Sequence, residues 1–258
     1  MSDTPKPPLR IGLFATCLMN LFRPTIGFAA AKLLEDAGCI LCVPQGQTCC
    51  GQPGYNSGDN GSARALAKQV IATFEDYDYV VGPSGSCMAT IRHDYPVLLA
   101  EDHEWRDRAT AVAAKSWELT SFLVDVLGIT SVQARLDGIV TYHDSCSGLR
   151  GLGIKGQPRQ LLAGVEGLTL HEMTDSEVCC GFGGTFCVKY PEISVKMVDD
   201  KIRNIRETGA DTLIGGDLGC LMNIAGRLSR NGSPIRVFHT AEVLAGMAEG
   251  PGIGDGRS

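Results

Sequence analysis

One cysteine-centred pattern occurs twice in the sequence. Two adjacent cysteines followed by a glycine stand near residue 50 and again near residue 180. Another cysteine precedes each pair by 32 or 33 residues, and a further one follows it by 37 or 40 residues. Three landmarks in the same order at similar offsets indicate that a unit of about 130 residues is present twice. The first set is Cys17, Cys49, Cys50 and Cys87, and the second is Cys146, Cys179, Cys180 and Cys220.

Each copy alternates short apolar segments with longer amphipathic ones. Short continuous apolar strands between such helices are typical of a parallel sheet with helices on its faces. The sequence therefore predicts an α/β protein made of two pseudo-symmetric repeats of parallel-sheet β-α units. We expect strands at residues 10–16, 39–44, 78–82, 138–143, 168–172, 211–215 and 235–239, and helices at 26–37, 62–75, 87–100, 158–165, 191–208, 220–230 and 240–248.

The pattern divides the chain into two cysteine-rich units. We assign residues 1–135 to the first repeat and residues 136–258 to the second. Residues 104–128 are expected to form a long helix that joins the two copies, and residues 250–258 to form a loose tail.

Composition narrows the class of protein. A chain of 258 residues can bury a sizeable core without disulfide staples. Its 23 Lys and Arg and 29 Asp and Glu give a net charge of −6, which argues against nucleic acid as a partner, because nucleic-acid-binding surfaces are basic. No run approaches roughly 18 uncharged apolar residues, so we expect no transmembrane segment. The start, MSDTPKPPLR, has no apolar h-region, so we expect no signal peptide and a cytoplasmic protein.

The chain contains eleven cysteines, an odd number and a high one for a cytoplasmic protein. In a reducing compartment thiols stay free unless something binds them. The cysteine pattern therefore indicates metal or redox chemistry rather than disulfide bridges.

The four cysteines of each copy follow successive predicted strands. In parallel sheets, ligands bind beyond the carboxyl ends of the strands, so each set of thiols is expected to gather at that edge. Helices begin near several of these positions, and helix N-termini stabilise thiolates. Adjacent Cα atoms are about 3.8 Å apart, so both members of a cysteine pair can reach one multinuclear centre. The following glycines let backbone N–H groups approach closely; they are Gly51 and Gly181.

Four thiolates are a common ligand set for a [4Fe–4S] cluster and also suit structural zinc. Structural zinc usually recruits paired C-x-x-C knuckles, which this pattern lacks. The spacing therefore favours iron–sulfur clusters, one or two per chain, and leaves zinc as the alternative.

Long motifs in this sequence resemble a known family. They resemble the cysteine-rich (CCG) domains found in heterodisulfide reductase and in the glycolate oxidase iron–sulfur protein, and more closely the lactate utilization protein A family. The resemblance covers nearly the whole chain, through FATCLMNLFRPTIGFAAAKLLEDAGC, QTCCGQPGYNSG, GPSGSC, HDSC, CCGFGGTF and GGDLGCLMNIAGRL.

The resemblance implies a cytoplasmic iron–sulfur protein that takes part in oxidising L-lactate, a small 2-hydroxy acid, to pyruvate. It implies two companion lactate utilization proteins as partners, one of them a ferredoxin-type iron–sulfur protein. This chain would serve as an electron-transfer or catalytic subunit. It has no evident flavin or nicotinamide site, so a partner or another cofactor would complete the two-electron oxidation.

The chain departs from the full CCG pattern at two positions. Where that pattern has the first cysteine of a C-x-x-C, this sequence has Ser84 and Asp217. The cysteine-rich polypeptide of heterodisulfide reductase uses five cysteines for each noncubane cluster, whereas four thiolates suit an ordinary cubane. Ser84 or Asp217 would then supply an oxygen ligand or a hydrogen bond near the cluster, or Asp217 would be the N-cap of the helix at 220–230.

Other reactive residues lie outside the two cysteine sets. His143, with Asp144 beside it, stands at a predicted strand end and is the candidate catalytic residue. The cysteines outside the repeat pattern are interpreted as packed thiols; they are Cys39, Cys42 and Cys187. Two other functions remain open: a non-enzymatic zinc protein, and a thiol–disulfide reductase component of the heterodisulfide type.

Overall fold

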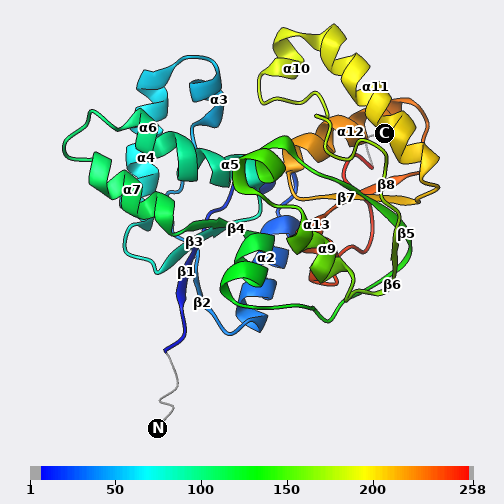
Figure 1. The fold of residues 1–258 in the computed structure, drawn as a ribbon, viewed down its shortest axis with the longest axis horizontal. Coiled ribbons are helices and arrows are strands. Elements are labelled where there is room, and N and C mark those ends of the chain that lie inside the picture. Colours follow the sequence, from blue (N-terminus) through cyan, green and yellow to red (C-terminus); the bar gives the residue numbers. More distant parts are fainter. Residues whose placement is uncertain (1–6, 256–258) are drawn as a thin grey trace.

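A computed structural model describes residues 7–255 of the protein (Figure 1). Two parallel sheets of four strands each lie side by side, with strand orders β2-β1-β3-β4 and β6-β5-β7-β8. The same order occurs in both halves, which confirms the predicted α/β fold of two repeats. The strands are β1 (Arg10–Leu13), β2 (Ile40–Cys42), β3 (Tyr79–Gly82), β4 (Ser116–Glu118), β5 (Arg135–His143), β6 (Glu166–Leu170), β7 (Thr212–Gly215) and β8 (Arg236–His239).

Helices follow nearly every strand. In the first half they are α1 (Cys17–Phe22), α2 (Thr25–Asp36), α3 (Gln52–Asn56), α4 (Asn60–Phe74), α5 (Gly85–Ala89), α6 (Tyr95–Leu98), α7 (Arg106–Ala114) and α8 (Leu119–Ser121). In the second half they are α9 (Gly156–Leu162), α10 (Phe186–Lys189), α11 (Pro191–Glu207), α12 (Leu218–Arg230) and α13 (Thr240–Leu244). Three π-helical turns complete the set: η1 (Thr90–Asp94), η2 (Phe122–Val126) and η3 (Ser147–Gly151).

Both faces of the first sheet are covered. Adjacent residues of β3 enter different apolar clusters, because side chains alternate along a strand. Val80 packs with buried residues of α4, α6 and α7, whereas Val81 packs with those of α2. A sheet buried on both faces explains why its strands read as continuous apolar runs.

The long helix predicted for residues 104–128 is wrong. The chain forms α7, then the short strand β4, which pairs with β3 through Val80 and Ser116, and then α8 and η2. Ser116 and Glu118 are buried, and Arg92 stacks on Trp117 with its guanidinium carbon 4.5 Å from the ring centre. A three-residue strand is too short to show an alternating pattern, so the flanking helical spacing concealed it.

The predicted loose tail is also corrected in part. Ile253 is buried, and its N–H donates to the carbonyl oxygen of Val237 in β8 at 2.8 Å. The N–H of Gly252 donates to the carboxylate of Asp255 at 2.8 Å. The segment therefore packs on β8 as far as residue 255. Residues 256–258 lie outside the described residues. Residues 1–6 also lie outside them, and they form most of the N-terminal stretch on which the expectation of no signal peptide is based.

Glu118 ends β4 and caps the helix that follows. Its side chain is almost fully buried, and its Oε2 atom accepts the N–H of Thr120 at 2.8 Å and the N–H of Ser121 at 3.2 Å. Burial raises the pKa of Glu118 to about 7, in spite of these hydrogen bonds. The folded protein therefore binds a proton at this carboxyl group more tightly than the unfolded chain does.

We expect this carboxyl group to make stability depend on pH. Its contribution should be fully present below about pH 4.5 and should fall as the pH rises through about 7, by at most about 3 kcal/mol. Glu118→Gln should remove that slope from the free energy of unfolding measured by urea titration between pH 4 and 8. Glu207→Gln, at an exposed site, is the control. An unchanged slope in the Glu118 variant would contradict the assignment.

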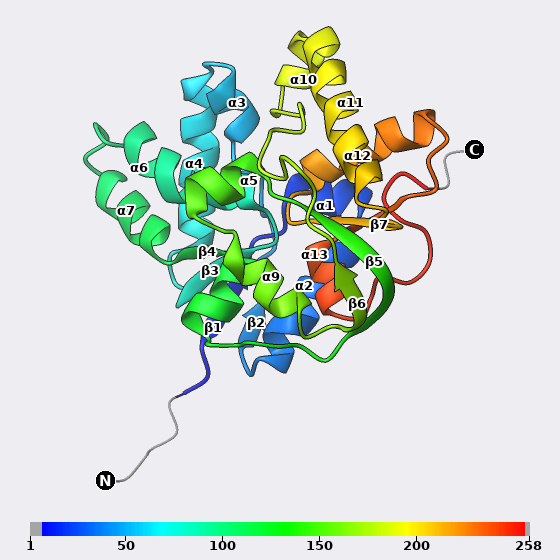
Figure 2. The same cartoon turned by 45° about the vertical axis from the view of Figure 1, so that its right-hand side comes forward.

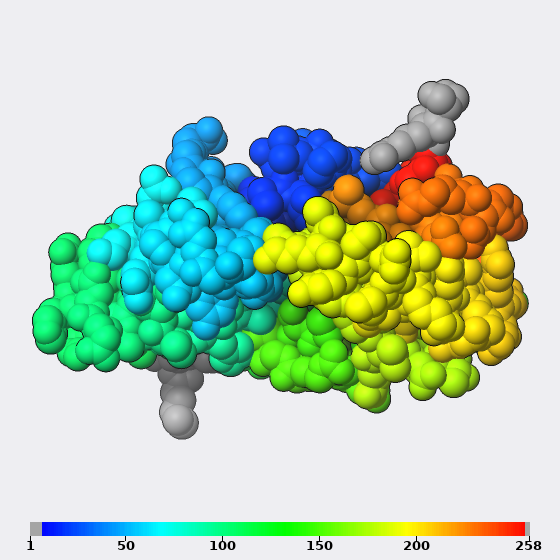
Figure 3. Space-filling view, turned by 90° about the horizontal axis from the view of Figure 1, so that it is seen from above, coloured from blue at the N-terminus to red at the C-terminus, as the bar shows by residue number. Residues whose placement is uncertain are grey.

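The two halves pack closely against each other. Helix α2 lies on α13, and α12 lies on α1 (Figure 2). Likewise, α9 lies on α8, and α5 lies on η3. In Figure 3 the blue N-terminal part of the chain lies against the orange part that belongs to the second half. The larger apolar cluster takes residues from both halves, Ile26 and Val243 among them. The division of the chain after residue 135 stays a prediction. Within residues 7–255, no helix is both long and apolar enough to cross a membrane.

Candidate metal centres

The first set of cysteines gathers at the carboxyl edge of the first sheet. Cys17 opens α1 just after β1, the pair Cys49 and Cys50 follows β2, and Cys87 lies in the first turn of α5 after β3. The Sγ atoms of Cys17 and Cys49 are 3.8 Å apart. The N–H of Gly51 donates to the Sγ atom of Cys49 at 3.4 Å, which the left-handed φ of +85° at this glycine permits.

Hydrogen bonds concentrate negative charge on one thiol of this set. The pKa of Cys49 is lowered by hydrogen bonds from the thiols of Cys17 and Cys50 and from the N–H of Gly51. The pKa of Cys17 is raised because its thiol is the donor to Cys49 and because it is partly buried. A thiolate surrounded by further thiols is the donor set that a soft metal centre requires.

A cavity of about 230 Å³ lies beside these four cysteines, and all four line it. Since a water molecule needs only about 10–15 Å³ of such space, the cavity admits a group of many atoms. Its other wall comes from the second half of the chain, namely Phe182, Gly184, Thr185, Asp217, Leu218 and Gly219. The first site is therefore completed by the second repeat.

The second set of cysteines gathers at the matching edge of the second sheet. Cys146 follows β5, the pair Cys179 and Cys180 follows β6, and Cys220 lies in the first turn of α12. The N–H of Gly181, at a φ of +86°, donates to the Sγ atom of Cys179 at 3.4 Å, as its counterpart does in the first set. A hydrogen bond to Cys179, together with burial, raises the pKa of Cys146.

His143 lies within the second set. Its side chain is 1% exposed, and its ring nitrogen lies within 4.8 Å of the Sγ atoms of Cys180 and Cys220, which are themselves within that distance of each other. Burial lowers the pKa of His143 to about 3, with the nearby Lys201 as a further cause. The ring is therefore neutral at neutral pH. A catalytic role for His143 stays a prediction.

Asp144 forms a buried ion pair beside this set. Its two carboxylate oxygens accept hydrogen bonds from Arg159 at 2.9 and 2.8 Å, and the Asp144 side chain is 1% exposed. Arg159 also reaches Glu172, at 2.5 Å, and stacks over the ring of Tyr142. The ion pair between Asp144 and Arg159 therefore fixes the chain directly after β5, next to His143.

Ser84 and Asp217 both border the cavity of the first site. The hydroxyl oxygen of Ser84 accepts the N–H of Cys87 at 3.3 Å, so Ser84 is the N-cap of α5. Asp217 accepts the N–H of Ser86 at 2.8 Å and therefore also caps α5, which belongs to the other half of the chain. Asp217 stands at the N-cap position of α12, but its side chain makes no capping bond to that helix. The stronger hydrogen bond of this expected cap thus goes to α5, and the N–H of Gly219 in α12 acts less strongly on the same carboxyl group.

The remaining cysteines lie apart from these hydrogen-bonded groups. Cys39 precedes β2 and packs against the larger apolar cluster, and Cys42 ends that strand. The Cys187 thiol, in α10, donates to the carbonyl oxygen of Gly184 at 3.8 Å. Their interpretation as packed thiols stays a prediction.

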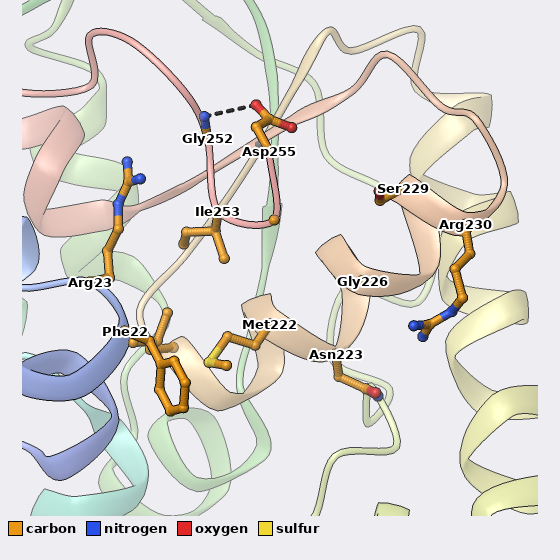
Figure 4. A pocket seen from close by; sticks show the side chains of 12 residues that line it. Phe22, Arg23, Met222, Asn223, Gly226, Ser229, Arg230, Gly252, Ile253 and Asp255 are labelled. Carbon is orange, nitrogen blue, oxygen red and sulfur yellow. Dashed lines mark hydrogen bonds between the residues drawn. The ribbon is translucent and has the colours of Figure 1, made fainter. Parts of the chain in front are cut away.

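A larger cavity, of about 490 Å³, lies beside α12 (Figure 4). The end of α1 and the C-terminal segment close it, and Phe22, Met222 and Ile253 are among its lining residues. Arg23 at its edge is held by Glu242, at 2.7 Å. None of its lining residues is a cysteine. The smaller cavity is therefore the better candidate for a metal centre.

Reasoning from the sequence missed the second half's contribution to the first site. The spacing of residues within one repeat does not predict which residues of the other repeat it will contact. The signal that was present is the glycine run after the second cysteine pair, where Gly183 and Gly184 take left-handed φ values of +50° and +64°. This conformation lets the chain turn toward the first site, and Thr185 lines the cavity there.

Comparison with known proteins identifies relatives over almost the full chain. The family model of the cysteine-rich domain, CCG, matches residues 11–92 and 140–225. Lactate utilization protein A of Bacillus cytotoxicus is 51% identical over 92% of this chain and 98% of the relative. The protein of the same name from a Geobacillus species is 53% identical over 92% of this chain and 99% of the relative.

A solved structure of a hypothetical protein from Helicobacter pylori has a similar fold. It superposes with a TM-score of 0.66 at 14% identity, over 96% of this chain and 51% of that one. The chain thus spans about half the length of that protein. At this identity the likeness supports the fold alone.

Proposed function

The chain belongs to the lactate utilization protein A family, and from this membership we propose that it is the iron–sulfur subunit of a system that oxidises L-lactate to pyruvate. It would bind a [4Fe–4S] cluster at each of its two cysteine sets. The ligands would be Cys17, Cys49, Cys50 and Cys87 at the first site and Cys146, Cys179, Cys180 and Cys220 at the second.

The observation that carries this proposal is the 230 Å³ cavity lined by all four cysteines of the first set. Four thiol groups around a space that admits many atoms fit a multinuclear centre. A bound cluster supplies one-electron transfer at the sheet edge. The chain's own residues supply thiolates, and the N–H groups of Gly51 and Gly181 stabilise the negative charge on sulfur.

The proposed reaction needs more than this chain. Oxidation of a 2-hydroxy acid to a 2-oxo acid removes two electrons and two protons, whereas iron–sulfur clusters carry electrons singly. Two companion lactate utilization proteins, one of them of the ferredoxin type, would complete the system in the cytoplasm. The name of the relatives supports lactate as the substrate of this system.

One observation favours zinc as the second candidate. The 3.8 Å between the Sγ atoms of Cys17 and Cys49 is close to the edge of a tetrahedron whose Zn–S bonds are about 2.3 Å long. A structural zinc ion would then hold each set together and carry no electrons. The cavity beside the cysteines argues the other way, because a single tetrahedral ion does not need it.

Metal analysis separates the two candidates. Protein purified without oxygen is expected to contain iron and acid-labile sulfide in comparable amounts and to absorb broadly in the visible range, because thiolate-bound clusters do so. Iron, sulfide and zinc are measured on the same preparation by elemental and colorimetric assay. Stoichiometric zinc without sulfide would overturn the iron–sulfur proposal.

A further inference from the structure

We propose that His143 binds the metal centre of the second site through a ring nitrogen, so that the two sites of this chain hold their centres with different donor sets. The inference rests on the proposed function in taking a metal centre to be bound there. It adds a ligand that the cysteine pattern does not contain and assigns different properties to the two centres.

The buried ring of His143 is poorly satisfied by the residues around it. Neither of its nitrogens makes a hydrogen bond of regular geometry within residues 7–255, although the Ser176 backbone lies near the ring and the residue is only 1% exposed. A buried polar group without a partner is costly, so such groups call for a ligand. The other fully buried histidine, His239, lacks a partner only at Nε2, because its Nδ1 atom accepts the N–H of Ala241 at 3.1 Å.

The ring of His143 also lies close to two thiols of the second site. One ring nitrogen of His143 and the Sγ atoms of Cys180 and Cys220 all lie within 4.8 Å of one another. In a tetrahedral site, metal–nitrogen bonds of about 2.0–2.1 Å and metal–sulfur bonds of about 2.3 Å hold the ligand atoms of one ion about 3.5–3.8 Å apart. Small side-chain movements therefore place all three donors on one metal ion or on neighbouring irons of a cluster.

The first site has a phenylalanine at the position that His143 takes in the second. Phe14 precedes Cys17 by three residues, as His143 precedes Cys146. The backbones of Phe14 and His143 also occupy equivalent places. The carbonyl oxygen of Phe14 faces Gly82, and that of His143 faces Gly215; a Cβ atom added to either glycine would lie 3.4 or 3.3 Å from the oxygen, respectively. The phenyl ring of Phe14 has no donor atom and packs against Phe74. The first site therefore offers thiolates without a nitrogen ligand.

The charge around the two sites differs as well. Lys201 is 2% exposed, and Cys180 and Cys179 are among the groups that act on it electrostatically. Gly51, which follows the first cysteine pair, packs on Ala63 of α4, and Gly181, which follows the second, packs on Ser194 of α11. Val70 follows Ala63 by the same number of residues as Lys201 follows Ser194, so Val70 takes the position in the first half that Lys201 takes in the second. A nitrogen ligand and a nearby positive charge both favour the reduced state of a cluster. A cluster held at the second site would therefore have a higher reduction potential than one held at the first.

Pulsed electron paramagnetic resonance tests the ligand directly. Cys50→Ala protein, in which the second centre remains, is prepared with ¹⁵N-labelled histidine and reduced without oxygen. A strong coupling to a directly bound ¹⁵N nucleus is expected. It should disappear when His143→Phe is added and persist when the exposed His171→Phe is added instead. The reciprocal Cys180→Ala protein, which keeps the first centre, should show no such coupling.

The outcomes separate this inference from the proposed function. Iron and sulfide at the second site without a bound-histidine coupling in Cys50→Ala protein would overturn the role of His143 alone, even if the His143 variant failed to fold. Absence of iron and sulfide would overturn the iron–sulfur proposal. Co²⁺ added to the same variants would then be the probe, and a ligand-field spectrum that is identical with and without His143 would overturn its role.

Discussion

Cys50→Ala and Cys180→Ala are each expected to remove about half of the bound iron and sulfide, because each deletes a ligand of one of two separate centres. Both thiols are buried, 2% and 1% exposed, and both belong to the hydrogen-bonded groups at the sheet edges. Iron per chain is measured after anaerobic purification, and circular dichroism confirms that the variants fold. The double variant should lose nearly all of its iron.

Cys39→Ala is the matched control. Cys39 is a partly buried thiol that packs against the apolar cluster and has no counterpart in the second repeat. Its removal should leave the iron content at the level of the unaltered protein. Equal loss of iron in all three single variants would mean that the ligand assignment is wrong.

Arg159→Leu is expected to lower the free energy of unfolding by about 3–5 kcal/mol, because it leaves the carboxylate of Asp144 buried without its partner. The Arg159 side chain is 18% exposed and that of Asp144 only 1%. Urea titration at neutral pH measures the loss. Adding Asp144→Asn should restore part of it, since the unpaired charge is then removed.

Arg227→Leu supplies the comparison for that variant. Arg227 also makes two hydrogen bonds to a carboxylate, that of Asp199, at 2.6 and 2.7 Å. These two side chains are 27% and 36% exposed, so water and salt screen their attraction. The loss in this variant should be much smaller. Equal losses of unfolding free energy in the two variants would show that burial does not make the ion pair of Asp144 and Arg159 more important for stability than the exposed pair.

The parts of the molecule that the sequence predicted are those encoded within one repeat. Apolar runs ending at Cys17, Cys87, Cys146 and Cys220 marked strands of two parallel sheets, and parallel strands bring their carboxyl ends to one edge. The positions of the strand ends therefore predicted that each set of thiols lies at the carboxyl edge of its sheet. It also placed most of the helices, because their apolar spacing is regular over several turns.

The parts that escaped prediction depend on contacts between repeats or on very short elements. β4 has three residues, too few for a recognisable period. Periodicity shows that one face of α2 is buried, but it does not reveal that α13 covers that face. Asp217 has the residue type of a helix cap, and only the tertiary structure shows that its partner is the N–H of Ser86 in the other half.

The contacts between the two halves come in equivalent pairs, which is the arrangement expected of two copies of one unit. Each half offers the helix after its first strand to the segment after the other half's last strand, as α2 does to α13 and α9 to α8. Two copies of a shorter chain would meet in this way about a twofold axis, each covering an apolar face that the other exposes. In such a homodimer both cysteine sites must be identical. In a single chain that constraint is absent, so one site can hold Phe14 where the other holds His143.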